Sequence, residues 1–252
     1  MGKPLDGQTI LVTGATGGLG AAIVEQVAAA GARPILHYNS DKSNAEALLK
    51  RINGKGVVLR CGLSAPDGAF ELWRRAVEAE GRIHGLVNNA GIRTEITVDA
   101  SPDEWRLAWL KEFQVNVFAA ADLCREAIKH FKEHGGGRIV NMSSRAGQRG
   151  YAANAMPYGA SKAALSNITK SIARSFGNDG ITAVNICPGW VATDMAEDFV
   201  AKHGKAAAVA DIPIGEMASP FEVAELVAFV LRPSQASLNG ATLDVNGGSY
   251  IR

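Results

Sequence analysis

The sequence has few cysteines, no surplus of either charge and no long apolar run. Its 3 cysteines among 252 residues, Cys61, Cys124 and Cys187, lie far apart and form no C-x-x-C pair. A disulfide framework and a zinc ribbon are therefore not expected, no metal site is expected, and a reducing compartment is the simpler interpretation. The 26 lysines and arginines balance 25 aspartates and glutamates, so no strong field attracts nucleic acid or an anionic membrane.

The first residues of the sequence show no pattern of a targeting segment. The first seven residues are polar, and the apolar run after them is too short for a signal peptide or a spanning helix. We therefore expect a soluble, cytoplasmic protein.

Short apolar runs alternate with longer helical patterns along the chain. The helical segments have apolar residues three and four apart, as at Leu165, Ile168 and Ile172. Strands that alternate with helices predict βαβ units and a parallel sheet covered on both faces, which is a doubly wound α/β sandwich of the Rossmann type with three layers. The expected strands are 9–12, 35–37, 57–59, 85–87, 138–141, 182–187 and 241–245.

No linker, internal repeat or low-complexity tract divides the chain, so one domain over residues 1–252 is expected. Segment 192–216 breaks the alternation and contains no expected strand. Insertions of this kind near the end of a sheet often form a lid or a wall of the substrate site. We expect 192–216 to be such a substrate-side insertion.

The first expected strand runs into a glycine-rich turn, TGATGGLG at residues 13–20, and a helix follows. Gly14, Gly18 and Gly20 would let the backbone turn tightly and approach a diphosphate. The helix N-terminus adds unpaired N–H groups and a positive dipole end. A P-loop is excluded, because no glycine-lysine-serine/threonine closes the turn. The alternative is a glycine-rich turn with packing value only.

Tyr158 and Lys162 open another helical pattern and, being four residues apart, share one helix face. A free tyrosine has a pKa of about 10 and is a poor proton donor and acceptor at neutral pH. A cation within about 4–6 Å favours the phenolate, so the pair makes sense as a proton donor and the residue that tunes it. The alternative is a surface tyrosine beside a solvated lysine.

Two further polar residues stand in apolar surroundings. Ser144 ends the strand pattern 139–144 and lies 14 residues before Tyr158, so a loop can bring its hydroxyl beside the phenol. Asn116 interrupts an apolar helical segment, where the alternative is a satisfied core amide.

These features together resemble the short-chain dehydrogenase/reductase family over nearly the whole chain. The turn at 13–20 fits the cofactor turn of the family, and NNAG at 88–91 fits its motif after the fourth strand. Pro188-Gly189 with Thr193 fits the segment that binds the nicotinamide carboxamide, and 239–248 fits the last strand and tail. Within the family the sequence is most similar to 3-oxoacyl-carrier-protein reductases, while sugar and polyol dehydrogenases share much of the pattern.

The resemblance implies a seven-stranded sheet in the order 3-2-1-4-5-6-7 and hydride transfer between a nicotinamide and a carbonyl/alcohol pair. It gives Asn116, Ser144, Tyr158 and Lys162 as the catalytic tetrad. Tyr158 would donate the proton, Lys162 would lower its pKa and hold the ribose, Ser144 would bond the substrate oxygen, and Asn116 would hold a relay water. Ser143 is the rival for the serine role. The implied cofactor-binding residues are Gly14, Thr16, Gly18, Leu19, Gly20, Tyr38, Asn39, Ser40, Leu63, Asn89, Ala90, Gly91, Tyr158, Lys162, Pro188, Gly189, Val191 and Thr193.

The choice between NADP(H) and NAD(H) depends on the end of the second strand. An acid there bonds the ribose 2′-OH of NAD and repels a 2′-phosphate, but Tyr38 occupies that position. Asn39 and Ser40 can donate hydrogen bonds to a phosphate, and Lys42 can add a positive charge. Asp41 can oppose a phosphate, or it can cap the following helix instead. Thr16 and Gly17 stand where phosphate-preferring relatives often carry arginine, which argues against a phosphate. On balance we expect NADP(H), and hence a reductase.

One position departs from the family pattern, and the assembly and the substrate pocket lie outside the catalytic motifs. Gly62 stands where many members have an Asp or Asn that meets the adenine. The apolar pattern over 220–231 exceeds one helix face. The family resemblance implies homotetramers, in which the last strand and the long helices at 101–134 and 157–177 form two-fold contacts, with a dimer as the second choice. Residues 93–98, 145–156 and 192–216 are expected to line the substrate pocket; they and their neighbours include Arg93, Arg145, Arg149, Trp190 and Met195. The arginines could meet an acidic substrate, but solvated loop arginines are the commoner case.

Other functional classes remain open at this point. The first alternative is an NAD-dependent sugar or polyol dehydrogenase. A methyltransferase also has a glycine-rich first turn, but it leaves Tyr158, Lys162 and Ser144 unexplained. A non-catalytic nucleotide sensor on the same fold is expected to have lost the tetrad, which is intact here.

Overall fold

The computed structural model describes residues 2–252, except the side chains of Asp194, Met195 and Asp198. Seven parallel strands form its sheet, in the order β3-β2-β1-β4-β5-β6-β7, which confirms the expected fold class and strand order. The strands are β1 Thr9–Val12, β2 Arg33–Tyr38, β3 Val57–Arg60, β4 Gly85–Asn88, β5 Gly137–Met142, β6 Ile181–Pro188 and β7 Thr242–Val245.

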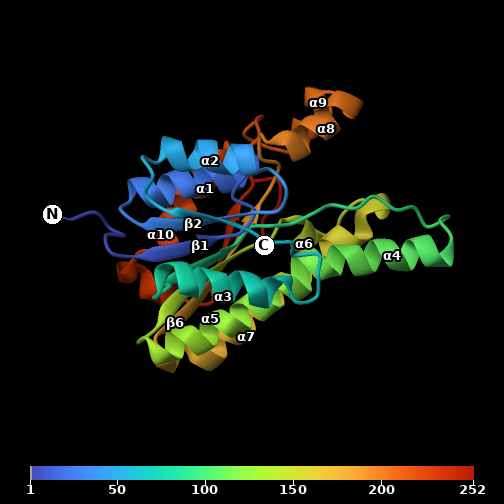
Figure 1. Cartoon of the computed structure of the whole chain (residues 1–252). Coiled ribbons are helices and arrows are strands. Elements are labelled where there is room, and N and C mark those ends of the chain that lie inside the picture. Colours follow the sequence, from blue (N-terminus) through green and yellow to red (C-terminus); the bar gives the residue numbers. More distant parts are fainter. Residues whose placement is uncertain (1) are drawn as a thin grey trace.

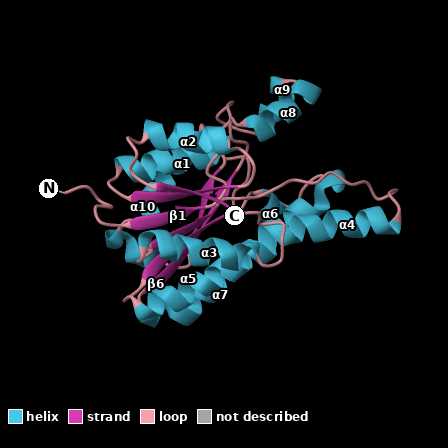
Figure 2. Ribbon diagram, viewed as in Figure 1, coloured by secondary structure: helices cyan, strands magenta, loops and turns pink. Residues whose placement is uncertain are grey.

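Helices cover both faces of the sheet (Figures 1 and 2). One face packs on α1 (Gly18–Ala29), α2 (Lys42–Arg51) and α10 (Pro220–Val230). The other face packs on α3 (Gly68–Glu80), α5 (Ala119–Glu133) and α7 (Met156–Phe176). Alternation along β1 assigns the two cores, because Ile10 and Val12 enter the first and Leu11 enters the second. Strands buried on both faces therefore read as continuous apolar runs.

The remaining helices connect these layers, and α4 and α6 follow the carboxyl ends of β4 and β5. α4 (Pro102–Phe113) extends past the sheet and continues through a π-helical turn, η1 (Gln114–Phe118), into α5 (Figure 1). α4 begins at a capping box in which Ser101 and Glu104 satisfy each other's backbone N–H groups. α6 (Ala146–Arg149) and the 3₁₀ turn η2 (Ala153–Ala155) precede α7. Two more 3₁₀ turns, η3 (Gly177–Asp179) and η4 (Pro233–Leu238), follow α7 and α10.

The expected insertion 192–216 holds two helices, α8 (Asp194–His203) and α9 (Lys205–Val209). Figure 2 shows both helices standing off the body beyond α2, with loops that connect them to the carboxyl edge of the sheet. A single bridge between Val191 and Ala218 closes the base of this segment. Within residues 2–252, no helix has both the length and the apolarity needed to cross a membrane.

Candidate active site

A cavity of about 580 Å³ lies at the carboxyl ends of the strands. Parallel strands point their carboxyl ends to the same edge, where open α/β sheets bind ligands. Of the residues expected to form the site, Tyr38, Ser40 and Asn116 do not line the cavity. Those that do line it are Gly14, Thr16, Gly18, Leu19, Gly20, Asn39, Leu63, Asn89, Ala90, Gly91, Ser144, Tyr158, Lys162, Pro188, Gly189, Val191 and Thr193.

The glycine turn between β1 and α1 is built so that side chains do not fit. Gly14 has a φ of +63°, and a Cβ on it would lie 2.9 Å from the Cα of Ala90. A Cβ on Gly20 would lie 2.0 Å from the carbonyl oxygen of Gly14. No side chain caps α1 at Gly17, so the first N–H groups of the helix face the cavity without an internal acceptor. This cradle fits the diphosphate of a dinucleotide, because it offers backbone donors and excludes side chains.

His37 braces this turn from β2. Its Nδ1 accepts a hydrogen bond from the backbone N–H of Gly14 at 3.1 Å, and its Nε2 lies 3.1 Å from the carbonyl oxygen of Cys61. The ring is therefore neutral with its proton on Nε2, and burial lowers the pKa of His37 to about 4. The turn and the loop after β3 are thus tied to the same ring, a contact that the sequence pattern does not indicate.

Tyr158 and Lys162 lie on one face of α7, as expected, with the ammonium 5.8 Å from the centre of the phenol ring. The expectation that the pKa of Tyr158 is lowered is not met in the structure: burial raises it to about 12, and a hydrogen bond with Ser144 opposes that rise. Burial also lowers the pKa of Lys162 to about 8, whereas the negative charge of Glu112 raises it. The Lys162 Nζ donates to the carbonyl oxygen of Met142 at 2.8 Å, which fixes the side chain beside the tyrosine.

The two candidate serines after β5 have different surroundings. The Ser143 hydroxyl is 2.7 Å from the carbonyl oxygen of Lys162, to which it donates, and 2.8 Å from the hydroxyl of Ser166. The Ser144 oxygen accepts a hydrogen bond from the N–H of Ala146 at 3.1 Å and lies beside Tyr158. Ser143 is therefore occupied by internal contacts, and Ser144 is the serine placed to meet a ligand at the phenol.

Asn116 lies behind the cavity wall, inside the π-helical turn η1. Its amide pairs with both backbone groups of Ile92, each at 2.9 Å, and donates to Ser161 at 3.0 Å. A Cβ on Gly91 would lie 3.3 Å from both the Asn116 oxygen and the Lys162 Nζ. Asn116 and Lys162 therefore meet where only glycine leaves room, although Asn116 itself does not line the cavity.

Glu112 is a buried carboxyl in this site that the motif comparison missed. It has no exposed surface, and its two oxygens accept from the Asn116 amide at 2.8 Å and from the Thr94 N–H at 2.7 Å. Burial raises the pKa of Glu112, and the two contacts with Thr94 and the charge of Lys162 oppose that rise. A charged residue four positions before Asn116 in an otherwise apolar segment was the available signal, because both side chains share a helix face.

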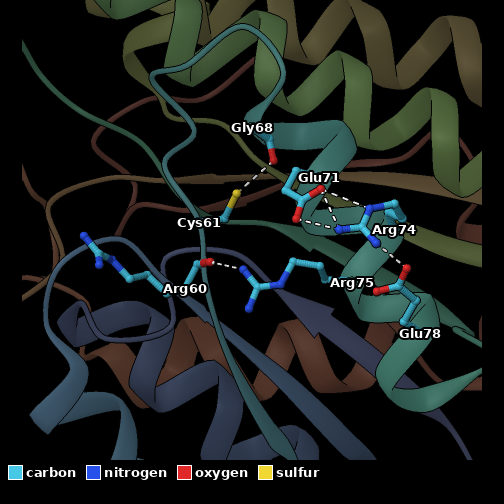
Figure 3. Close-up of polar contacts among 7 residues, drawn as sticks. All are labelled: Arg60, Cys61, Gly68, Glu71, Arg74, Arg75 and Glu78. Atoms are coloured by element: carbon cyan, nitrogen blue, oxygen red, sulfur yellow. Dashed lines mark hydrogen bonds and ion pairs between the residues drawn. The ribbon is translucent and has the colours of Figure 1, made fainter.

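The adenosine end of the cavity lies between β2 and β3. Asn39 lines the cavity there, whereas the side chain of Tyr38 is buried and Ser40 is exposed outside it. The guanidinium of Arg60 donates to the backbone oxygen of Asn39 at 3.1 Å. Figure 3 shows Arg74 held between Glu71 and Glu78, while the Arg60 guanidinium points away from those carboxylates. Arg60 itself does not line the cavity, and only the pairing of β3 with β2 brings it beside Asn39, so the sequence did not single it out.

The substrate end combines three loops and α4. Arg93, Arg145 and Trp190 line the cavity as expected, together with Lys111, which the sequence did not single out. The expectation of a solvated arginine is wrong for Arg145, which is only 4% exposed because α6 and the segment around Asp211 cover it. Arg149 does not line the cavity, and the side chain of Met195 lies outside the described residues.

Comparisons with known proteins agree with this geometry. A family model described as enoyl-(acyl carrier protein) reductase matches residues 14–250. The chain is 33% identical to the 3-oxoacyl-(acyl-carrier-protein) reductase FabG of Vibrio cholerae, over 98% of this chain and 99% of that protein. It is 35% identical to a short-chain type dehydrogenase/reductase of Picea abies, over 97% and 93% of the two chains. It is 32% identical to an NADPH-dependent aldehyde reductase-like protein of Arabidopsis thaliana, over 97% and 95%.

Proposed function

Because this chain belongs to the short-chain dehydrogenase/reductase family, and is an NAD(P)-dependent oxidoreductase acting on a carbonyl/alcohol pair, we propose that it is an NADP(H)-dependent carbonyl reductase. The observation that carries the proposal is the arrangement of Ser144, Tyr158 and Lys162 in one cavity with the glycine turn. The uncapped start of α1 and the turn that excludes a Cβ on Gly14 and Gly20 fit a dinucleotide diphosphate.

When bound, the nicotinamide supplies the hydride for the carbonyl carbon. Tyr158 donates the proton to the carbonyl oxygen, and the product is the alcohol. A phenol whose pKa is raised to about 12 carries its proton at neutral pH but is a weak acid, so donation depends on the groups that stabilise the phenolate. Ser144 donates a hydrogen bond to the same oxygen, and the Lys162 ammonium stabilises the phenolate that remains.

Asn116 and Glu112 hold this arrangement from behind. The paired contacts of Asn116 with Ile92 fix the loop after β4 against η1, and Glu112 extends the same connection to Thr94. Lys162, next to Asn116 at Gly91, is the group through which a proton would return to Tyr158.

The preference for NADP(H) is supported by the charges at the adenosine end. Tyr38 replaces the carboxylate that would bond a free ribose 2′-OH, and its buried side chain adds no charge there. Asn39 lines the cavity, and Arg60 places a guanidinium against the backbone of Asn39. A guanidinium matches a phosphate in charge and geometry.

The substrate class is supported by the relatives. The Vibrio cholerae protein is named for 3-oxoacyl thioesters, and the Arabidopsis thaliana protein for aldehydes. We propose a 3-oxoacyl thioester or a small oxo compound as the substrate. The test is a screen of 3-oxo thioesters, aldehydes, sugars and polyols with NADPH, NADH and their oxidised forms, followed at 340 nm. Turnover of sugars or polyols with NAD, and none of carbonyl compounds with NADPH, would favour the dehydrogenase alternative.

A further inference from the structure

Positive charge gathers at the substrate end of the cavity. Among the cavity-lining side chains that the structure describes, Arg93, Lys111, Arg145 and Lys162 are cationic and none is a carboxylate. Lys162 belongs to the catalytic group. The other three come from the loop after β4, from the last turn of α4 and from the loop before α6. Three separate parts of the chain therefore each place a positive charge at this cavity.

Arg145 is the most unusual of these cations, because it directly follows Ser144 and is 4% exposed. Its Nη1 forms an ion pair with an oxygen of Asp211 at 3.1 Å, but Nη1 makes no well-aligned hydrogen bond to any described residue. Asp211 is also shared with Arg149, at 2.9 Å. One carboxylate therefore faces two guanidinium groups, and a buried donor remains unsatisfied, which is costly unless a ligand satisfies it.

Arg93 and Lys111 extend the charge toward the catalytic phenol. Arg93 places one nitrogen 2.7 Å from Glu95 and another 3.3 Å from the hydroxyl of Tyr151. The ring of Tyr151 lies 5.6 Å from that of Tyr158. Arg93 is thus one aromatic ring away from the catalytic phenol, while Lys111 and Arg145 line the same cavity. The carboxylates that pair with Arg93 and Arg145 are Glu95 and Asp211, and both are more than 40% exposed.

We propose that the carbonyl substrate carries an anionic group, a carboxylate or a phosphate, which Arg145 binds with support from Arg93. This inference rests on the proposed carbonyl reductase function and adds the charge of the substrate. A planar guanidinium with free donors binds a carboxylate or phosphate in two-pronged fashion, and such charge-assisted bonds are the strong ones. The anion can belong to a small oxo acid or to the phosphate-bearing arm of a thioester carrier.

Two matched pairs of substrates distinguish these sources. The first pair is 3-oxobutanoate and its methyl ester. The second is the coenzyme A thioester of 3-oxobutanoate and its neutral N-acetylcysteamine thioester. We expect kcat/KM to be about 10- to 100-fold higher for the anionic member of one pair in the wild type, the range of one or two charge-assisted contacts. The first pair reports a carboxylate and the second reports a phosphate.

The variants Arg145→Met and Arg149→Met form the matched comparison. Arg145→Met should abolish the preference within the pair, and Arg149→Met should keep it, because Arg149 shares Asp211 but does not line the cavity. Arg145→Lys should retain part of the preference, because it keeps the charge and loses the fork. Circular dichroism and melting temperature show that each variant is folded.

The inference is overturned if the wild type prefers neither anionic member, or if Arg145→Met lowers both members of each pair by the same factor. If Arg145 serves only to hold Asp211, Arg145→Met lowers kcat/KM equally for the anionic and the neutral member, and Asp211→Asn gives the same equal loss. Failure of the proposed function looks different: no probe is reduced with either nicotinamide, or Tyr158→Phe leaves the turnover of the neutral esters unchanged.

A second measurement does not depend on turnover. In wild-type protein mixed with NADP⁺, 3-oxobutanoate or inorganic phosphate should raise the melting temperature, and the same anion should fail to do so in Arg145→Met. The absence of a shift with both anions in the wild type also overturns the inference.

Discussion

At the residue scale, the chemistry of the site depends on how burial shifts the pKa of each titratable group. Tyr158 and Lys162 are both shifted toward their neutral forms, because desolvation disfavours a charge on either. At neutral pH the phenol is therefore protonated. The pKa of the lysine, about 8, lies close to neutral pH, so the lysine can both hold and release a proton. This combination suits reduction, in which Tyr158 gives its proton to the substrate and a proton returns to it through Lys162.

Tyr158→Phe removes the proton donor and leaves the ring packing. We expect kcat to fall about 10²- to 10⁴-fold, the usual contribution of general acid–base catalysis. The fold and the affinity for the dinucleotide should change little, as checked by melting temperature and by quenching of protein fluorescence on NADPH addition. If the variant keeps more than about a tenth of wild-type kcat on a substrate whose chemistry limits the rate, Tyr158 is not the acid.

Glu112→Gln tests the buried carboxyl. The negative charge of Glu112 raises the pKa of Lys162, so its removal should lower that pKa further. The limb of the pH–kcat profile that belongs to Lys162 should therefore move to lower pH. Glu104→Gln, at the start of the same helix, removes an equal charge far from Lys162 and should leave the profile in place. A general loss of kcat with an unmoved profile would make Glu112 a packing residue only.

At the element scale, the pairing of β2 with β3 sets the adenosine end of the site. The register places Tyr38 opposite Arg60, and the Arg60 side chain reaches back to Asn39. Neither strand alone carries this information, because the two residues lie 22 positions apart. The same pairing leaves Tyr38 buried, so the identity of that residue matters chiefly through the carboxylate it replaces.

Arg60→Met tests the cofactor preference of this edge. The KM for NADPH should rise about 10-fold, because one charge-assisted contact to the 2′-phosphate is lost, while the KM for NADH should stay the same. Arg75→Met is the control, since the Arg75 guanidinium donates to the backbone oxygen of Arg60 (Figure 3) and does not line the cavity. A wild-type kcat/KM that is higher with NADH than with NADPH would contradict the proposed preference itself.

At the scale of the whole molecule, two helices present apolar side chains to solvent. Leu107 and Leu110 on α4 are 67% and 63% exposed, and Phe118 in η1 is 49% exposed. On α10, Phe221 is 54% exposed. Large apolar side chains exposed on a helix face are typical of surfaces that pack against another chain. They support the proposed homotetramer, in which two different two-fold contacts cover the two helices.

Light scattering at micromolar concentration measures the assembly directly. We expect a mass near four times the 26.4 kDa of the chain, with twice that mass as the second choice. Leu107→Glu with Leu110→Glu should reduce the mass, because buried charges destabilise an apolar interface. Ala47→Glu, at an exposed position of α2 on the other face of the sheet, is the control. A wild-type mass equal to one chain would end the proposal.

The sequence by itself determined the features that depend on local spacing. The period of apolar residues indicated the strands and helices, and the resemblance gave their order in the sheet. Gly14 and Gly20 were predictable, because a turn that excludes a Cβ admits only glycine. Tyr158 and Lys162 were predictable as neighbours, because a helix places residues four apart on one face. The extent of the domain, 1–252, stays a prediction.

Only the tertiary structure decided what the loops at the carboxyl edge bring together. Arg145 is buried, Glu112 bonds Thr94, and Arg60 reaches Asn39, because segments distant in sequence meet there. Burial and charge pairing are sums over all neighbours in space, whereas a sequence pattern reports neighbours along the chain. The turn and the catalytic helix were therefore readable from sequence, but the charge of the substrate end and the pKa of each group became accessible only in the folded molecule.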